Sequence, residues 1–148
     1  MKPLLLRFLA LLLVIDSAAL RANAAGDSDA AYKTLLKAGT FSVGGVGIAG
    51  TITDSEIACR TLMKSAAPGP VFSKVLEEGT PAAKMFALCG LYYKSPETFA
   101  KVAATYRKSR ETFQYAAGCI IMNATIEDEM RNLEAKRFDG LLNDLPKR

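Results

Sequence analysis

Histidine and tryptophan are both absent from this sequence of 148 residues. Histidine is the usual general base of serine and cysteine hydrolases, the commonest zinc and copper ligand and a frequent axial ligand of haem. Its absence argues against all three classes, and the sequence indicates neither a metal ion nor a cofactor. Without tryptophan, only tyrosine and phenylalanine could stack on sugars or bases.

The N-terminal stretch has the pattern of a targeting segment. Two basic residues lead into an unbroken apolar run over residues 8–15, and small residues suited to a signal peptidase follow over 22–24. We therefore predict a signal peptide over residues 1–24 and a mature chain that begins at Ala25, with a cut after Ala19 as the alternative. The run is shorter than the roughly 20 residues of a membrane-spanning helix. The mature chain is thus expected to be periplasmic or extracellular, without an integral membrane segment.

Cysteine is scarce, with Cys59, Cys89 and Cys119 as the full set. An odd number in an exported chain leaves at least one thiol unpaired unless a bond forms between chains. Each cysteine has apolar neighbours in the sequence, which favours a buried cysteine that acts as a small hydrophobic residue. A disulfide between two of the three is the alternative. The spacing fits neither a C-x-x-C redox motif nor a zinc site. For a nucleophilic thiolate, only Arg60 or the positive end of a helix could supply the positive neighbour.

The net charge is small, because basic and acidic residues nearly balance. The formal net charge is +4, and removal of residues 1–24 lowers it to +2. This balance favours no particular partner, and an exported domain would seldom meet nucleic acid. One basic cluster has aromatic residues interleaved with it, and it consists of Tyr106, Arg107, Lys108, Arg110 and Tyr115. It is either a surface for an acidic partner or a solvated helix end.

We expect residues 25–148 to form a single domain. Four local patterns within it mark the starts of predicted helices. They are the capping box Thr53–Glu56, the pairs Thr80-Pro81 and Ser95-Pro96, and Thr125 with Asp128. Apolar residues at helical spacing follow each signal, and also occur over 28–37 and 71–79. The segment 80–93 has so few polar residues that we expect it to be the buried spine. Residues 112–121 fit either a short strand or an irregular packed segment.

A period of 30 residues separates the three cysteines, and CRTLMKS (59–65) matches CGLYYKS (89–95) at Cys, Lys and Ser. Such periods are typical of stacked helix pairs. TPAAKMFALCGL (80–91) resembles helical repeats of the HEAT type, and the resemblance extends over 53–107. It implies a helical scaffold that binds protein partners, with no catalytic residues. The predicted fold is mainly α: a compact bundle or short α-solenoid of five or six helices, with a glycine-rich loop and room for one short extended segment.

Gly45, Gly47 and Gly50 reproduce the G-x-G-x-x-G spacing of dinucleotide-binding sites. Such a site needs a strand that delivers the glycines directly to the start of a helix. Only residues 41–43 could form a strand, and residues 51–53 separate the last glycine from the helix start. We therefore predict a loop whose glycines permit positive φ or close packing. The functional alternative is a mobile binding lip or an anion nest at the start of the following helix.

Together these patterns predict an exported, non-catalytic protein-interaction or scaffold module of the cell envelope. The glycine stretch and the 106–115 cluster are its expected contact surfaces. One alternative is a thiol-dependent enzyme that uses one cysteine. Another is a binder of an envelope ligand, such as a wall fragment or lipid, which a cavity lined by Met85, Phe86 and Tyr92 would favour. The sequence specifies neither the partner protein nor an oligomeric state.

Overall fold

The computed structural model describes residues 26–140 and 142. The predicted signal peptide, residues 1–24, lies outside them. The described part is mainly helical, with six helices and a small three-stranded sheet. A helix over residues 26–36 comes first, followed by β1 (Thr40–Val46), α2 (Asp54–Met63), α3 (Pro68–Glu78), α4 (Pro81–Lys94), α5 (Pro96–Tyr106), β2 (Thr112–Gly118), β3 (Ile120–Thr125) and α6 (Ile126–Glu134).

Three of the four predicted helix starts carry the expected side-chain cap. The hydroxyl of Thr53 accepts from the backbone N–H of Glu56 (3.3 Å), that of Thr80 from Ala83 (3.1 Å) and that of Thr125 from Asp128 (3.1 Å). Ser95 makes no such bond, and α5 begins instead with a proline that needs no N–H partner. Each of these capping bonds joins residues three apart in the sequence. The local sequence pattern is therefore enough to predict the caps.

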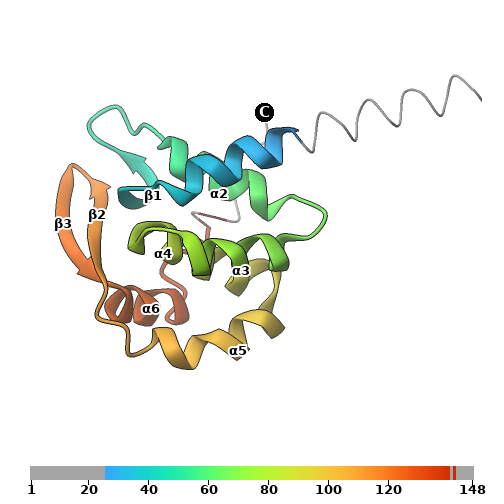
Figure 1. The fold of residues 1–148 in the computed structure, drawn as a ribbon. Helices are drawn as coiled ribbons and strands as arrows, with labels where there is room; N and C mark the ends of the chain where they lie inside the picture. The colour runs from blue at the N-terminus through green and yellow to red at the C-terminus, as the bar shows by residue number, and fades with distance from the viewer. Residues whose placement is uncertain (1–25, 141, 143–148) are drawn as a thin grey trace, which may run out of the picture.

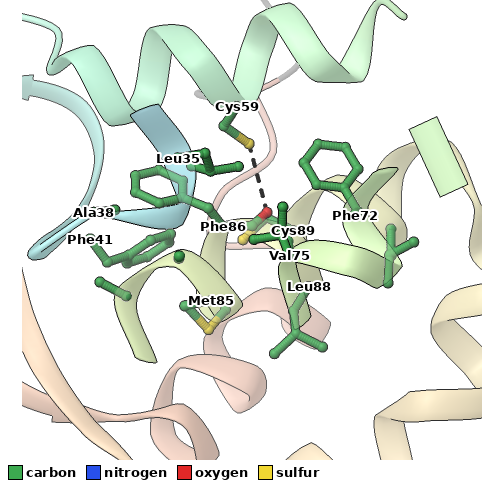
Figure 2. Packing of buried hydrophobic residues seen from close by; sticks show 14 of the residues in the cluster. Leu35, Ala38, Phe41, Cys59, Phe72, Val75, Met85, Phe86, Leu88 and Cys89 are labelled. Carbon is green, nitrogen blue, oxygen red and sulfur yellow. Dashed lines mark hydrogen bonds between the residues drawn. The ribbon is translucent and has the colours of Figure 1, made fainter. Parts of the chain in front are cut away.

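Helix α4 is the buried spine of the molecule, as predicted. It lies between the pair formed by the 26–36 helix and α2 on one side and helices α5 and α6 on the other (Figure 1). Every residue from Met85 to Leu91 is buried. Figure 2 shows Phe86 beside Leu35 and Phe41, and the rings of Phe86 and Phe41 meet edge to face with centroids 4.7 Å apart. The spine thus joins the first helix, the sheet and α3 in one core.

The sheet is the main departure from the predicted fold, which had room for a single extended segment. Strands β2 and β3 form an antiparallel hairpin, and β1 pairs in parallel with β2, Thr40 opposite Gln114 and Ser42 opposite Ala116. Gly44 and Gly45 therefore lie in a strand, where a loop was predicted. The chain is not purely a helical bundle. Strand β1 was missed because its partner is distant in sequence and its glycines weaken the local strand pattern.

The 30-residue period does not continue as a helical repeat. Cys59 lies in α2 and Cys89 in α4, and each of these helices is followed by another helix. Cys119, by contrast, lies in the turn between β2 and β3. The predicted solenoid thus has no third helical unit. Among the described residues, every helix is too short or too polar to cross a lipid bilayer.

Candidate functional site

The three glycines of the G-x-G-x-x-G spacing shape the end of β1 and a tight turn. Gly47 and Gly50 have φ values of 73° and 62°, in the left-handed region that glycine adopts without strain. Val46 and Thr51 exchange two backbone hydrogen bonds of 2.9 Å across the turn. A β carbon on Gly45 would lie 2.7 Å from the Gly50 backbone. The turn geometry alone therefore accounts for all three glycines.

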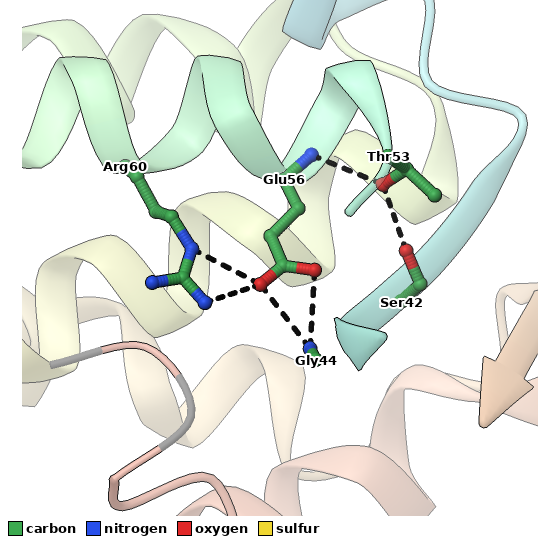
Figure 3. A network of polar contacts seen from close by, with 5 residues as sticks. All are labelled: Ser42, Gly44, Thr53, Glu56 and Arg60. Carbon is green, nitrogen blue, oxygen red and sulfur yellow. Dashed lines mark hydrogen bonds and ion pairs between the residues drawn. The ribbon is translucent and has the colours of Figure 1, made fainter. Parts of the chain in front are cut away.

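Residues 41–43, the one stretch here that the sequence allows as a strand, lie in β1, and β1 leads through this turn into α2. A carboxylate of the chain itself occupies the position an anion would take, however. Glu56 has no exposed surface, and its two oxygens accept from the backbone N–H of Gly44 at 3.1 and 3.2 Å. The guanidinium of Arg60 donates to the same carboxylate at 3.0 and 2.5 Å (Figure 3). An external phosphate would have to displace a buried, paired carboxylate, which disfavours both the cofactor site and the anion nest.

Ser42 and Thr53 complete this polar network. Their hydroxyls are 2.8 Å apart, and Thr53 also caps α2 (Figure 3). The network fastens the strand that carries the glycines to the start of α2. The network is structural, because its hydrogen bonds join groups of β1, Thr53 and α2 to one another.

The cysteines divide into two buried thiols and one exposed thiol, and all three are free. Cys59 donates to the carbonyl of Phe86 over 3.6 Å, and Cys89 lies nearby in the core (Figure 2). Burial raises the pKa of both thiols, so neither is a thiolate at neutral pH. Arg60, the expected activating neighbour of Cys59, is engaged with Glu56. Only Cys119, in the β2–β3 turn, is open to solvent.

The basic cluster does not form an interleaved aromatic surface. Tyr115 packs against Phe41 with ring centroids 5.8 Å apart, and Tyr106 donates to the carbonyl of Leu76 at 3.4 Å. Burial raises the pKa of both tyrosines. The guanidinium of Arg107 pairs with Glu134 on α6 at 2.7 and 2.9 Å. Lys108 and Arg110 are exposed, so the cationic side chains face solvent while both aromatic side chains pack inward.

The three residues expected to line a ligand cavity lie elsewhere than in two grooves that the described residues form. Met85 and Phe86 are fully buried, and the ring of Tyr92 meets that of Phe99 edge to face. Two open grooves lie elsewhere, one of about 350 Å³ between the 26–36 helix and α2, the other of about 190 Å³ beside Leu62 and Val71. Across residues 26–140 and 142, acidic and cysteine side chains do not gather into a group that could hold a metal ion.

The sequence interpretation missed an exposed apolar surface at the end of the sheet, which we call the tip patch: Ile48, Ile120, Ile121 and Met122. Their exposed fractions are 100, 60, 66 and 46%. The two turns that carry them adjoin, because the backbone N–H of Gly47 donates to the carbonyl of Gly118 at 2.8 Å. Figure 1 shows both turns at the same end of the sheet. Side chains alternate along a strand, so Ile120 and Met122 lie on one face of β3 and Ile121 on the other. Scattered exposed hydrophobic residues are ordinary, but four large ones on two adjoining segments indicate a contact surface around this edge of the sheet.

The register of the hairpin explains the exposure of β3. Ile121 lies opposite Ala116 and Ile120 opposite Ala117, so small side chains on β2 leave the isoleucines uncovered. One sequence signal could have revealed this surface. The stretch 116–125 contains no charged residue and no proline, although it lies within a domain with many charges.

Comparison with known proteins matches this chain to no described family, to no curated protein and to no solved structure.

Proposed function

We propose that this protein is an exported, non-catalytic protein-interaction module of the cell envelope and that the tip patch is its contact surface. The observation that carries the proposal is the exposure of Ile120, Ile121 and Met122 on an edge strand. Large apolar side chains in water cost free energy, which contact with a partner recovers at roughly 25 cal/mol per Å² of apolar surface covered.

The surroundings of the patch support recognition over catalysis. Two of the three thiols are buried, and the strand that leads into the glycine turn is bonded through Gly44 to the chain's own carboxylate, Glu56. The patch contains no acid, base or nucleophile apart from the neighbouring Cys119. Export rests on the targeting pattern of residues 1–24.

Photo-crosslinking tests the contact surface in the cells that produce the protein. A photoreactive phenylalanine analogue at position 121 of the full chain should yield light-dependent protein adducts. The matched control carries the analogue at Lys101, an exposed position on α5. Adducts at 121 and not at 101 support the proposal, and the additional changes Lys108→Ala and Arg110→Ala should leave them intact. Absence of adducts at 121, or equal adducts at both positions, would overturn it.

A further inference from the structure

The outer side of β3 is an unpaired sheet edge. The strand order is β1-β2-β3, and β3 forms its ladder with β2 alone. Within the described chain, no backbone group bonds to the other side of β3 between Ile120 and Asn123. This edge therefore presents a row of free donors and acceptors beside three exposed apolar side chains.

Strand β3 lacks the features that keep natural sheet edges from pairing. Such edges carry lysine, inward-pointing charges, proline or a bulge. Residues 116–125 contain no charge and no proline. The register from Thr112 opposite Thr125 to Ala117 opposite Ile120 is continuous, so the hairpin has no bulge. The edge is thus open to a further strand.

We infer that the occupant of this edge is a second copy of the same chain, with β3 pairing antiparallel to β3 about a two-fold axis at Ile121. This inference rests on the proposed function, because it names the partner of the same surface. A two-fold interface requires a surface that complements itself. With Ile121 opposite its own copy, Ile120 lies opposite Met122 of the second chain and Met122 opposite Ile120. On one face of the joined sheet Ile121 then lies beside its own copy, and on the other face Ile120 of each chain lies beside Met122 of the other.

Charge also favours a second copy. Like charges placed directly opposite across a strand pair destabilise it, and self-pairing places residues of β3 opposite residues of β3 alone. Because β3 is neutral throughout, self-pairing creates no such repulsion. The nearest acids in sequence, Glu111 and Glu127, lie beyond the Thr112–Thr125 end of the hairpin, away from the axis.

The register makes a geometric prediction about Cys119. It lies two residues from the axis, so the two copies of Cys119 are four residues apart along the strands, about 14 Å at 3.4 Å per residue. A disulfide tolerates at most about 7 Å between Cα atoms. Cys119 therefore cannot link the two chains, whereas a cysteine at position 121 would face its own copy.

The test combines sedimentation equilibrium with cysteine crosslinking of the intact purified protein. We expect a dimer, and we expect Ile121→Cys in a Cys119→Ser background to form a disulfide-linked dimer on mild oxidation. Native Cys119, and Lys101→Cys in the same background, should stay monomeric on denaturing gels. Ile121→Lys should raise the dimer dissociation constant at least about tenfold, since it sets two like charges face to face. Gln114→Lys, which adds the same charge to an exposed position of β2, should leave it nearly unchanged.

A protein that stays monomeric at all concentrations, or a dimer linked through Cys119 and not through position 121, would overturn the inference. If such a monomer still gives adducts with another protein from position 121 in cells, the proposed function stands and only the second copy is wrong. If position 121 gives adducts with no protein at all, its own copy included, both proposals fall. Circular dichroism of each variant verifies that the exposed substitutions leave the fold intact.

Discussion

At the scale of single residues, Glu56 shows how one side chain joins a strand to a helix. In a capping box, the acid at this position usually accepts from the backbone N–H of the capping residue. Here the carboxylate accepts from Gly44 of β1 and pairs with Arg60 one turn along α2. It is fully buried, which is rare for a glutamate without such partners. The same contacts close the glycine segment to external anions.

Replacement of this carboxylate should be costly. We expect Glu56→Gln to lower the free energy of unfolding by about 1–3 kcal/mol, because a neutral amide weakens the bonds with the guanidinium and can turn an N–H toward that of Gly44. Urea unfolding followed by circular dichroism measures the change. Glu97→Gln is the control, since Glu97 lies exposed in the first turn of α5, and its effect should stay within about 0.5 kcal/mol. Equal effects of the two changes would contradict the structural role of Glu56.

At the scale of elements, the close approach of α3 to α4 depends on a glycine in the middle of a helix. A β carbon on Gly90 would lie 2.3 Å from the ring of Phe72, far inside van der Waals contact. In an isolated helix, alanine in place of glycine would be stabilising by about 1 kcal/mol. In this core the steric conflict outweighs that gain, because both residues are buried and the ring cannot move into solvent.

We therefore expect Gly90→Ala to lower the free energy of unfolding by about 1–3 kcal/mol, as overpacked cores do. Gly26→Ala is the matched control, since Gly26 also lies in a helix but has no atom within 4 Å of the added carbon. That change should be neutral or slightly stabilising. Thermal unfolding of both variants gives the comparison, and a neutral Gly90→Ala would contradict the packing described here.

The helices and strands differ in how well the local sequence predicts them. Helices α2, α4 and α6 start where threonine caps mark them, because cap and helix bonds join residues three or four apart. Strand β1 was read as a loop and the hairpin left ambiguous, because a strand is stabilised by a partner whose position the local sequence does not state. In the same way, the tyrosines of the basic cluster were assigned to the surface although Phe41 and Leu76 draw them inward.

At the scale of the whole molecule, the small sheet lies at one side of a helical body (Figure 1). That arrangement sets the 47–50 turn and the β2–β3 turn next to each other, so their exposed apolar side chains lie at the same end of the sheet. The structure places the residues of both expected contact surfaces without testing whether they bind a partner. The glycine turn contributes Ile48, and the basic cluster is divided between solvent and core.

The export proposal predicts the form in which the whole protein is released. Intact mass measurement of the exported chain should give a product that lacks residues 1–24 and begins at Ala25. Ala24→Leu should block or displace this cleavage, because a signal peptidase requires small residues there. A product that begins at Leu20 would move the cleavage site, whereas an exported chain that retains Met1 would contradict cleavage altogether.

The sequence by itself determined the capped helix starts, the buried spine of α4 and the absence of histidine chemistry, since each depends on composition or on residues within one turn of each other. The tertiary structure alone decided that the glycine segment continues a strand, that Glu56 fills the site at its end, and that β3 presents its isoleucines to water. Those outcomes depend on which distant segments meet. The local sequence shows the spacing of apolar residues. Which of them are buried against other segments is seen only in the folded chain.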